Sequence, residues 1–186
     1  INYYHSDLLR MLNICFVFFF KKQSIYICIN YQFSDNMKWG PWHDMYYMFL
    51  MLATYGDEDF SQDEMTAVAE KFVNQRFEAD IDGDGVVDDA LPEDHTVFED
   101  VGAMYFDMWG DFDAQQEQLT KSSAAVAEYF SYNHNRMQSL INDMVDVAAA
   151  DGHIDNLEEQ MINMIADNWG CSANISYNAG VPVILF

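Results

Sequence analysis

Residues 144–169 read MVDVAAADGHIDNLEEQMINMIADNW and contain the end of one helix, a short turn and the start of the next. Apolar residues leading into the turn recur at i, i+3, i+4, i+7, i+8 and i+11, the spacing of one helix face. They are Met137, Leu140, Ile141, Met144, Val145 and Ala148. After the turn, Asp155 and Glu158 form an N-cap pair that starts the second helix. The stretch therefore predicts an antiparallel helical hairpin over residues 135–169.

A second stretch, MFLMLATYGDEDFSQDEMTAVAEKF at residues 48–72, has the same layout. It runs from an apolar helix end, through a turn containing Gly and Asp, to an N-cap pair formed by Ser61 and Glu64. The pattern predicts a second hairpin over residues 43–78. Because the two stretches are similar, we expect the two hairpins to pack against each other.

Two further amphipathic patterns, at residues 97–109 and 113–130, lie between the hairpins. Thr96 with Glu99 predicts a capping box at the start of the first of them. No alternating strand pattern of comparable strength competes with these helices. The predicted fold is all-α, a bundle of about six helices built from two similar antiparallel hairpins.

The composition limits the classes of partner. The chain has 186 residues, of which 51% are hydrophobic, enough to bury a core as one domain. It carries 8 Lys and Arg against 31 Asp and Glu, a formal net charge of −23. Such a surface repels phosphate backbones and anionic lipid, which argues against nucleic acid, and against a membrane for residues 37–186. We expect a cytoplasmic protein with a protein partner, although acidity alone also suits a highly soluble protein from a salty habitat.

The two ends of the chain differ from the rest. Residues 1–36 contain no Ala, Gly, Pro or Glu and carry a charge of +1, which leaves −24 for residues 37–186. The apolar run Met11–Phe20 is too short to span a bilayer. Residues 1–36 are an atypical leader that is non-native, membrane-associating or an accessory hairpin, and we expect a helical domain at 37–172 and an irregular tail at 173–186.

An acidic segment, DIDGDGVVDD at residues 80–89, has the spacing of a loop that wraps a hard cation. Ca²⁺ takes six to eight oxygen ligands at roughly 2.3–2.6 Å, and alternating aspartates in a tightly turning loop deliver them. Gly85 stands at the sixth position, where such a loop turns sharply. The predicted Ca²⁺ ligands are four carboxylates and one backbone carbonyl: Asp80, Asp82, Asp84, Asp88 and, through its carbonyl, Val86.

The loop departs from an EF-hand at its twelfth position, which is Leu91 in place of a bidentate Glu. Glu93 is a candidate for the missing ligand, and Asp94 is another. The segment is therefore EF-hand-like, and resembles the D-x-D-x-D-G loops of dockerin and thrombospondin type 3 repeats more than a calmodulin loop. The alternative interpretation is a solvated acidic turn between helices, because Gly and Asp favour turns without any metal.

The stretch Val147–Glu159 resembles the signature of TerB-like (tellurite resistance protein B-like) domains. It contains Ala-Asp151-Gly152, followed by the apolar Ile154 and the Asp155 cap. The resemblance implies a small all-helical fold and a link to tellurite resistance and related stress systems. It also implies a non-catalytic, metal-responsive or scaffold role.

The acidic residues of TerB-like domains are suspected metal ligands, which marks Asp151, Asp155 and Glu158 as a second, weaker metal-site candidate. Read as an EF-hand loop, this stretch would place Val147 and Ala149 at the first and third positions, where their side chains cannot bind a metal. Helix capping explains Asp155 and Glu158 without a metal.

Three functions follow from these patterns. The first is a non-catalytic TerB-like protein that binds Ca²⁺ through the loop at residues 80–89. The second is a calcium sensor or buffer that exposes a Met-rich groove to a partner, since the chain has 12 Met. The third is a Mg²⁺-dependent phosphohydrolase. His43-Asp44 resembles the metal-binding pair of HD-type phosphohydrolases, but the further His and Asp of that family are not evident, so we expect no enzyme.

Overall fold

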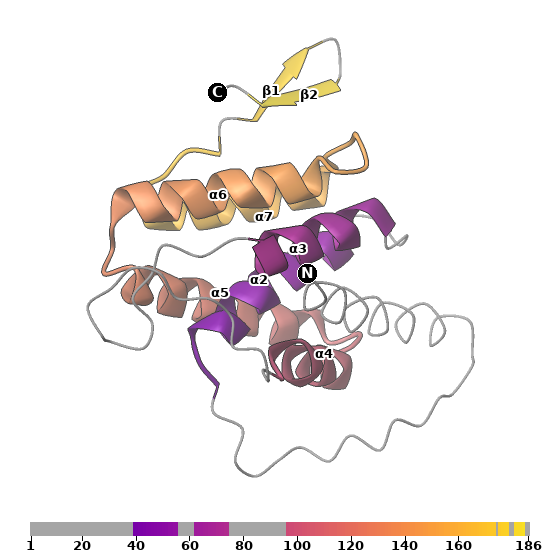
Figure 1. Ribbon diagram of the computed structural model, residues 1–186, viewed down its shortest axis with the longest axis vertical. Helices are drawn as coiled ribbons and strands as arrows, with labels where there is room; N and C mark the ends of the chain where they lie inside the picture. Colours follow the sequence, from indigo (N-terminus) through magenta and orange to yellow (C-terminus); the bar gives the residue numbers. More distant parts are fainter. Residues whose placement is uncertain (1–38, 56–61, 75–95, 174, 179–180, 185–186) are drawn as a thin grey trace.

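The computed structural model describes residues 39–55, 62–74, 96–173, 175–178 and 181–184 (Figure 1). These residues form six helices and one small sheet. The helices are α2 (Pro41–Tyr55), α3 (Gln62–Asn74), α4 (Val97–Asp107), α5 (Phe112–Tyr129), α6 (His134–Ala148) and α7 (Asn156–Trp169). The strands are β1 (Ile175–Asn178) and β2 (Val181–Ile184). The predicted helical bundle is confirmed, and each helix lies where its apolar pattern predicts.

Helix α2 is the centre of the core. Every residue from Met45 to Ala53 is at most 4% exposed. Helix α2 carries apolar side chains on all of its faces, so it is buried on all sides. It contacts each of the other five helices in the described part of the chain. In Figure 1, α2 lies between the α6–α7 pair and the α4–α5 pair.

The two predicted hairpins pack against each other. Helices α6 and α7 contact one another, as do α2 and α3. Contacts of α3 with α6, and of α2 with both α6 and α7, join the two hairpins. The stripe from Met137 to Ala148 is buried at this interface, as its spacing predicts.

The capping predictions have different outcomes. Asp155 and Glu158 form the predicted capping box, and α7 ends at Gly170 in the left-handed conformation with φ 64°. The box predicted at Thr96 is wrong, because the Thr96 side chain makes no capping bond and its Oγ1 donates to Asp100 Oδ2 at 2.6 Å. An N-cap side chain accepts a backbone N–H from an extended backbone, whereas Thr96 has φ −112° and ψ 14°, outside that conformation. Ser61 lies outside the described residues.

The expectation of an irregular tail at 173–186 is wrong over eight residues, because β1 and β2 pair as an antiparallel hairpin. The register pairs Ile175 with Ile184 and Asn178 with Val181. Five of the eight strand residues are β-branched or aromatic, and Ala-Gly separates the two segments, which is the composition of a hairpin. The sheet adds to the helical domain without changing its all-helical core.

Candidate functional site

The predicted Ca²⁺ loop belongs to the connection between α3 and α4. Its ligand residues Asp80, Asp82, Asp84, Val86 and Asp88, together with Glu93, lie outside the described residues. The described residues on either side of this connection show how its two ends are held.

Lys71 fixes the C-terminal part of α3 to α6. Its Nζ atom lies 2.6 Å from Asp143 Oδ1 and 2.8 Å from Asp146 Oδ2. Burial alone would lower the pKa of Lys71, but hydrogen bonds and attraction to the two aspartates outweigh burial and raise it. Lys71 is therefore a positively charged link between the two hairpins, three residues before α3 ends.

The start of α4 is held by the core and by polar contacts. Val97 and Phe98 are 4% and 0% exposed. Asp100 Oδ2 accepts the Thr96 hydroxyl and lies 3.5 Å from His43 Nε2 in α2. Both ends of the connection are thus attached to the folded helical core.

His43 and Asp44 do not form a common site. His43 faces Asp100 in α4, and its Nδ1 accepts the Gly40 backbone N–H at 3.2 Å. The Asp44 carboxylate faces α5. In this direction Asp44 Oδ1 accepts the Ser122 hydroxyl at 2.8 Å. The described geometry therefore does not reproduce the paired metal ligands of an HD-type phosphohydrolase.

Asp44 is the centre of a buried hydrogen-bond network. Besides Ser122, it accepts the Trp39 indole N–H at 2.9 Å and the Tyr129 hydroxyl at 3.4 Å. Burial raises the pKa of Asp44, and these three hydrogen bonds oppose that effect. Asp44 is 4% exposed, so its role is to join the N-terminus of α2 to α5.

The second acidic candidate lies in the turn between α6 and α7, where backbone N–H groups occupy its carboxylates. Asp151 Oδ1 accepts the His153 N–H at 2.8 Å. Asp155 Oδ1 accepts the N–H groups of Leu157 and Glu158 at 2.7 and 2.9 Å. Glu158 Oε2 accepts the Asp155 N–H at 2.9 Å. All three carboxylates thus serve the turn or the helix cap.

Glu158 also meets Glu64 across the hairpin interface. The two residues are 3% and 7% exposed, and their side chains are hydrogen-bonded to each other. A hydrogen bond between two carboxyl groups requires that one of them carry a proton. Burial raises the pKa of Glu158 to about 7, the charges of Asp155 and Asp151 add to the rise, and the hydrogen bonds from Asp155 and Glu64 oppose it.

The sequence carries a signal for this pair. Glu64 and Glu158 are the N3 residues of the two similar hairpins, so they occupy corresponding positions. Two carboxyl groups are too few to hold a metal alone. Across the described ranges, which omit the loop at 80–89, no three His, Cys, Asp or Glu side chains are grouped to hold a metal ion.

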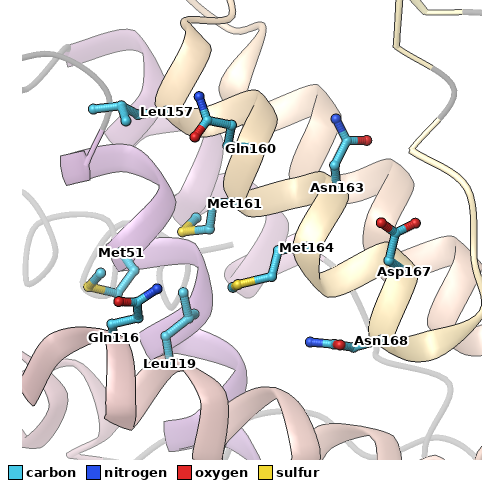
Figure 2. Close-up of a pocket in the computed structure, with 10 residues that line it drawn as sticks. All are labelled: Met51, Gln116, Leu119, Leu157, Gln160, Met161, Asn163, Met164, Asp167 and Asn168. Carbon is cyan, nitrogen blue, oxygen red and sulfur yellow. The ribbon is translucent and has the colours of Figure 1, made fainter. Parts of the chain in front are cut away.

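A groove of about 610 Å³ lies between α2, α5 and α7 (Figure 2). Its floor is formed by Met51, Leu119 and Met161, and the half-buried Met164 lies beside them. The remaining lining residues are exposed, and all but one of them are polar: Leu157, Gln116, Gln160, Asn163, Asp167 and Asn168. The helical spacing of Met161 in the sequence is that of a core residue and gives no sign that α7 lines a groove.

The fold and its polar links define an acidic all-helical domain made of two similar hairpins. The family profile described as "Tellurite resistance protein TerB" matches residues 46–176 of this chain. The match includes all six described helices except the first turn of α2, and the chain belongs to this family. No curated protein and no solved structure matches the chain. None of the described helices is long and apolar enough to cross a membrane.

Proposed function

We propose that this TerB-family protein is a non-catalytic calcium-binding protein of the cytoplasm, acting as a scaffold in a metal or stress response. The observation that carries the proposal is the D-x-D-x-D-G-x-x-D spacing of the loop. The proposed ligands are the four carboxylates and the carbonyl named above: Asp80, Asp82, Asp84, Asp88 and Val86, with Glu93 as a further candidate. Because Leu91 replaces the bidentate Glu, we expect a Kd of about 10⁻⁵–10⁻³ M.

The described helices support a structural role for the ion. The connection that contains the loop leaves α3 just after Lys71, which is ion-paired to α6, and enters α4 at the buried Val97. A cation that draws the aspartates of the loop together constrains the connection between α3 and α4 only when both of these helices are folded onto the core. Calcium should therefore bind the folded state preferentially and stabilise it, by roughly 2.7 kcal/mol at a hundredfold excess over Kd.

The test is isothermal titration of the full chain with Ca²⁺ and with Mg²⁺, combined with thermal melts. We expect binding of one Ca²⁺ and poor competition by Mg²⁺, which requires near-ideal octahedral geometry. The variant Asp80→Asn/Asp84→Asn should lose both the binding heat and the thermal shift. The matched control is Asp107→Asn/Asp113→Asn, which makes the same change in charge at exposed residues of α4 and α5. If millimolar calcium moves the melting temperature of neither the wild type nor the control, the loop is only an acidic turn.

The Met-lined groove favours a second candidate, a calcium sensor or buffer. Three methionines from two helices line the groove: Met51, Met161 and Met164. A sensor should expose more apolar surface when calcium binds, which increases the fluorescence of a hydrophobic dye. A structural site should gain stability without this increase. Equal binding of Mg²⁺ together with hydrolysis of a phosphate ester would support the phosphohydrolase alternative.

A further inference from the structure

The groove between α2, α5 and α7 combines an apolar floor with a rim of carboxamides. Methionine side chains are flexible and polarizable, so a floor of Met51, Met161 and Met164 adapts to apolar side chains of different shapes. Four carboxamides line the groove, and each offers both N–H donors and a C=O acceptor to a peptide backbone: Gln116, Gln160, Asn163 and Asn168. Figure 2 shows that the groove residues of α7 follow this helix along its length.

The charge of the groove lining, over the described residues, is negative. Asp167 is the one charged residue among the described lining residues, and none of them is basic. The described part of the chain has three basic residues. Lys71 is paired with Asp143 and Asp146, Lys121 with Glu117, and Arg136 lies on α6, which contributes no described lining residue. With a net charge of −23 on the whole chain, a ligand that enters this groove meets a negative potential.

We propose that the groove is a docking site for a basic amphipathic peptide segment of a partner protein. Its volume of about 610 Å³ accommodates a few large apolar side chains, such as those at i, i+3 and i+4 of one helix face. Flanking Lys or Arg residues of the partner would complement the acidic surface and accelerate association. The described lining residues come from α2, α5 and α7, so the inference does not rest on calcium binding by the loop.

Charge also argues against three other occupants. A second copy of this chain would bring another net charge of −23 to the interface, which opposes self-association at low salt. Anionic lipid and nucleic acid are repelled for the same reason. A basic peptide is the macromolecular ligand for which both the apolar floor and the electrostatic potential are favourable.

The experiment measures binding of a fluorescein-labelled peptide to the full chain by anisotropy, in EGTA. The probe has Leu at i, i+3, i+4 and i+7 and Lys at the remaining positions. A scrambled peptide of the same composition has no apolar face, and a third peptide has Glu in place of Lys. We expect the first peptide to bind at least about tenfold more tightly than either of the others, and its affinity to fall as NaCl increases.

Two groove variants, Leu157→Lys and Met164→Lys, should each weaken binding about tenfold or more. The matched control is Phe112→Lys, which makes the same change at an exposed apolar residue outside the groove lining. Leu157 is already 44% exposed, so its variant should keep the fold even if Met164→Lys does not. As an independent readout, the peptide should shift the ¹³C-methyl resonance of Met164 in the wild type and leave that of Met144 unchanged.

Four results would overturn the proposal. They are equal binding of the scrambled peptide, equal loss of affinity in Phe112→Lys, no methyl shift at Met164, and no binding in EGTA. Binding that appears only with calcium would support the sensor function instead. Dimers that dissociate in Leu157→Lys would assign the groove to a second copy of this chain. Loss of calcium binding in Asp80→Asn/Asp84→Asn without loss of peptide binding would leave the groove proposal intact.

Discussion

The hydrogen-bonded pair of Glu64 and Glu158 predicts an unusual dependence of stability on pH. Burial raises the pKa of Glu158 from its ordinary 4.5 to about 7 in the folded protein. The folded state therefore holds a proton over a pH range in which the unfolded chain has lost it. The resulting contribution to stability is fully present below about pH 4.5 and is lost as the pH rises through about 7.

The size of this effect follows from the same two pKa values. A rise from 4.5 to about 7 corresponds to about 3 kcal/mol between the protonated and ionised states of Glu158. Because Glu158 and Glu64 interact, the pKa of Glu158 is not independent of its neighbour, and we expect between about 1 and 3 kcal/mol to be measurable. Glu158→Gln should remove this loss, because its amide is neutral at every pH and its oxygen can still accept the Asp155 N–H.

The assay is urea unfolding of the wild type and Glu158→Gln in EDTA at several pH values between 5 and 8. We expect similar free energies of unfolding at pH 5, and a variant more stable than the wild type by about 1–3 kcal/mol at pH 8. Glu159→Gln is the matched control, since it removes the same charge one residue further along α7. A Glu158→Gln variant that is less stable at pH 8, or whose stability changes with pH as the wild type's does, would refute the shared proton.

Three other substitutions test the polar contacts and the end of α7. Lys71→Met should lower the free energy of unfolding by about 1–2 kcal/mol, because it leaves Asp143 and Asp146 without their cation. A double-mutant cycle with Asp143→Asn should show an energetic coupling between Lys71 and Asp143. Asp44→Ala should cost about 2–4 kcal/mol in urea unfolding, because three donors lose their acceptor and one of them, Ser122, is fully buried. Asp44→Asn should cost less, because its amide oxygen can still accept. Gly170→Ala should lower stability by about 1 kcal/mol, since φ at this residue is 64° and a side chain is strained there; an unchanged melting temperature would show that the helix end adjusts.

The helices and hairpins could be predicted because their signals are local. The stripe from Met137 to Ala148 and the cap at Asp155 depend only on residues within one or two helical turns, and both are confirmed. Thr96 shows the limit of this reasoning. Its sequence context is that of a capping box, but its backbone is not in the extended conformation from which an N-cap side chain accepts a backbone N–H. The conformation at the start of α4 depends on more than these few residues.

The site was less predictable because it depends on contacts between distant segments. Ser122 lies 78 residues from Asp44, and neither carries a sequence pattern that pairs them. The groove likewise requires α2, α5 and α7 to meet at a particular angle, which no single helix specifies. The loop at 80–89 differs from the groove, because its signal is the spacing of neighbouring residues in the sequence. Its ligands remain a prediction that the calcium titration tests.

The polar links between the two hairpins respond differently to pH. Lys71 joins α3 to α6 by charge attraction, and because its pKa is raised, this contribution is fully present below its ordinary pKa of 10.5. Glu64 and Glu158 meet at the N-terminal turns of α3 and α7, and the raised pKa of Glu158, about 7, predicts that this contact weakens as the pH rises through neutrality. One end of α3 therefore stays attached across neutral pH while the other loosens. Since the connection to the acidic loop leaves from the Lys71 end, alkaline pH should weaken the hairpin interface without releasing the attachment nearest the loop.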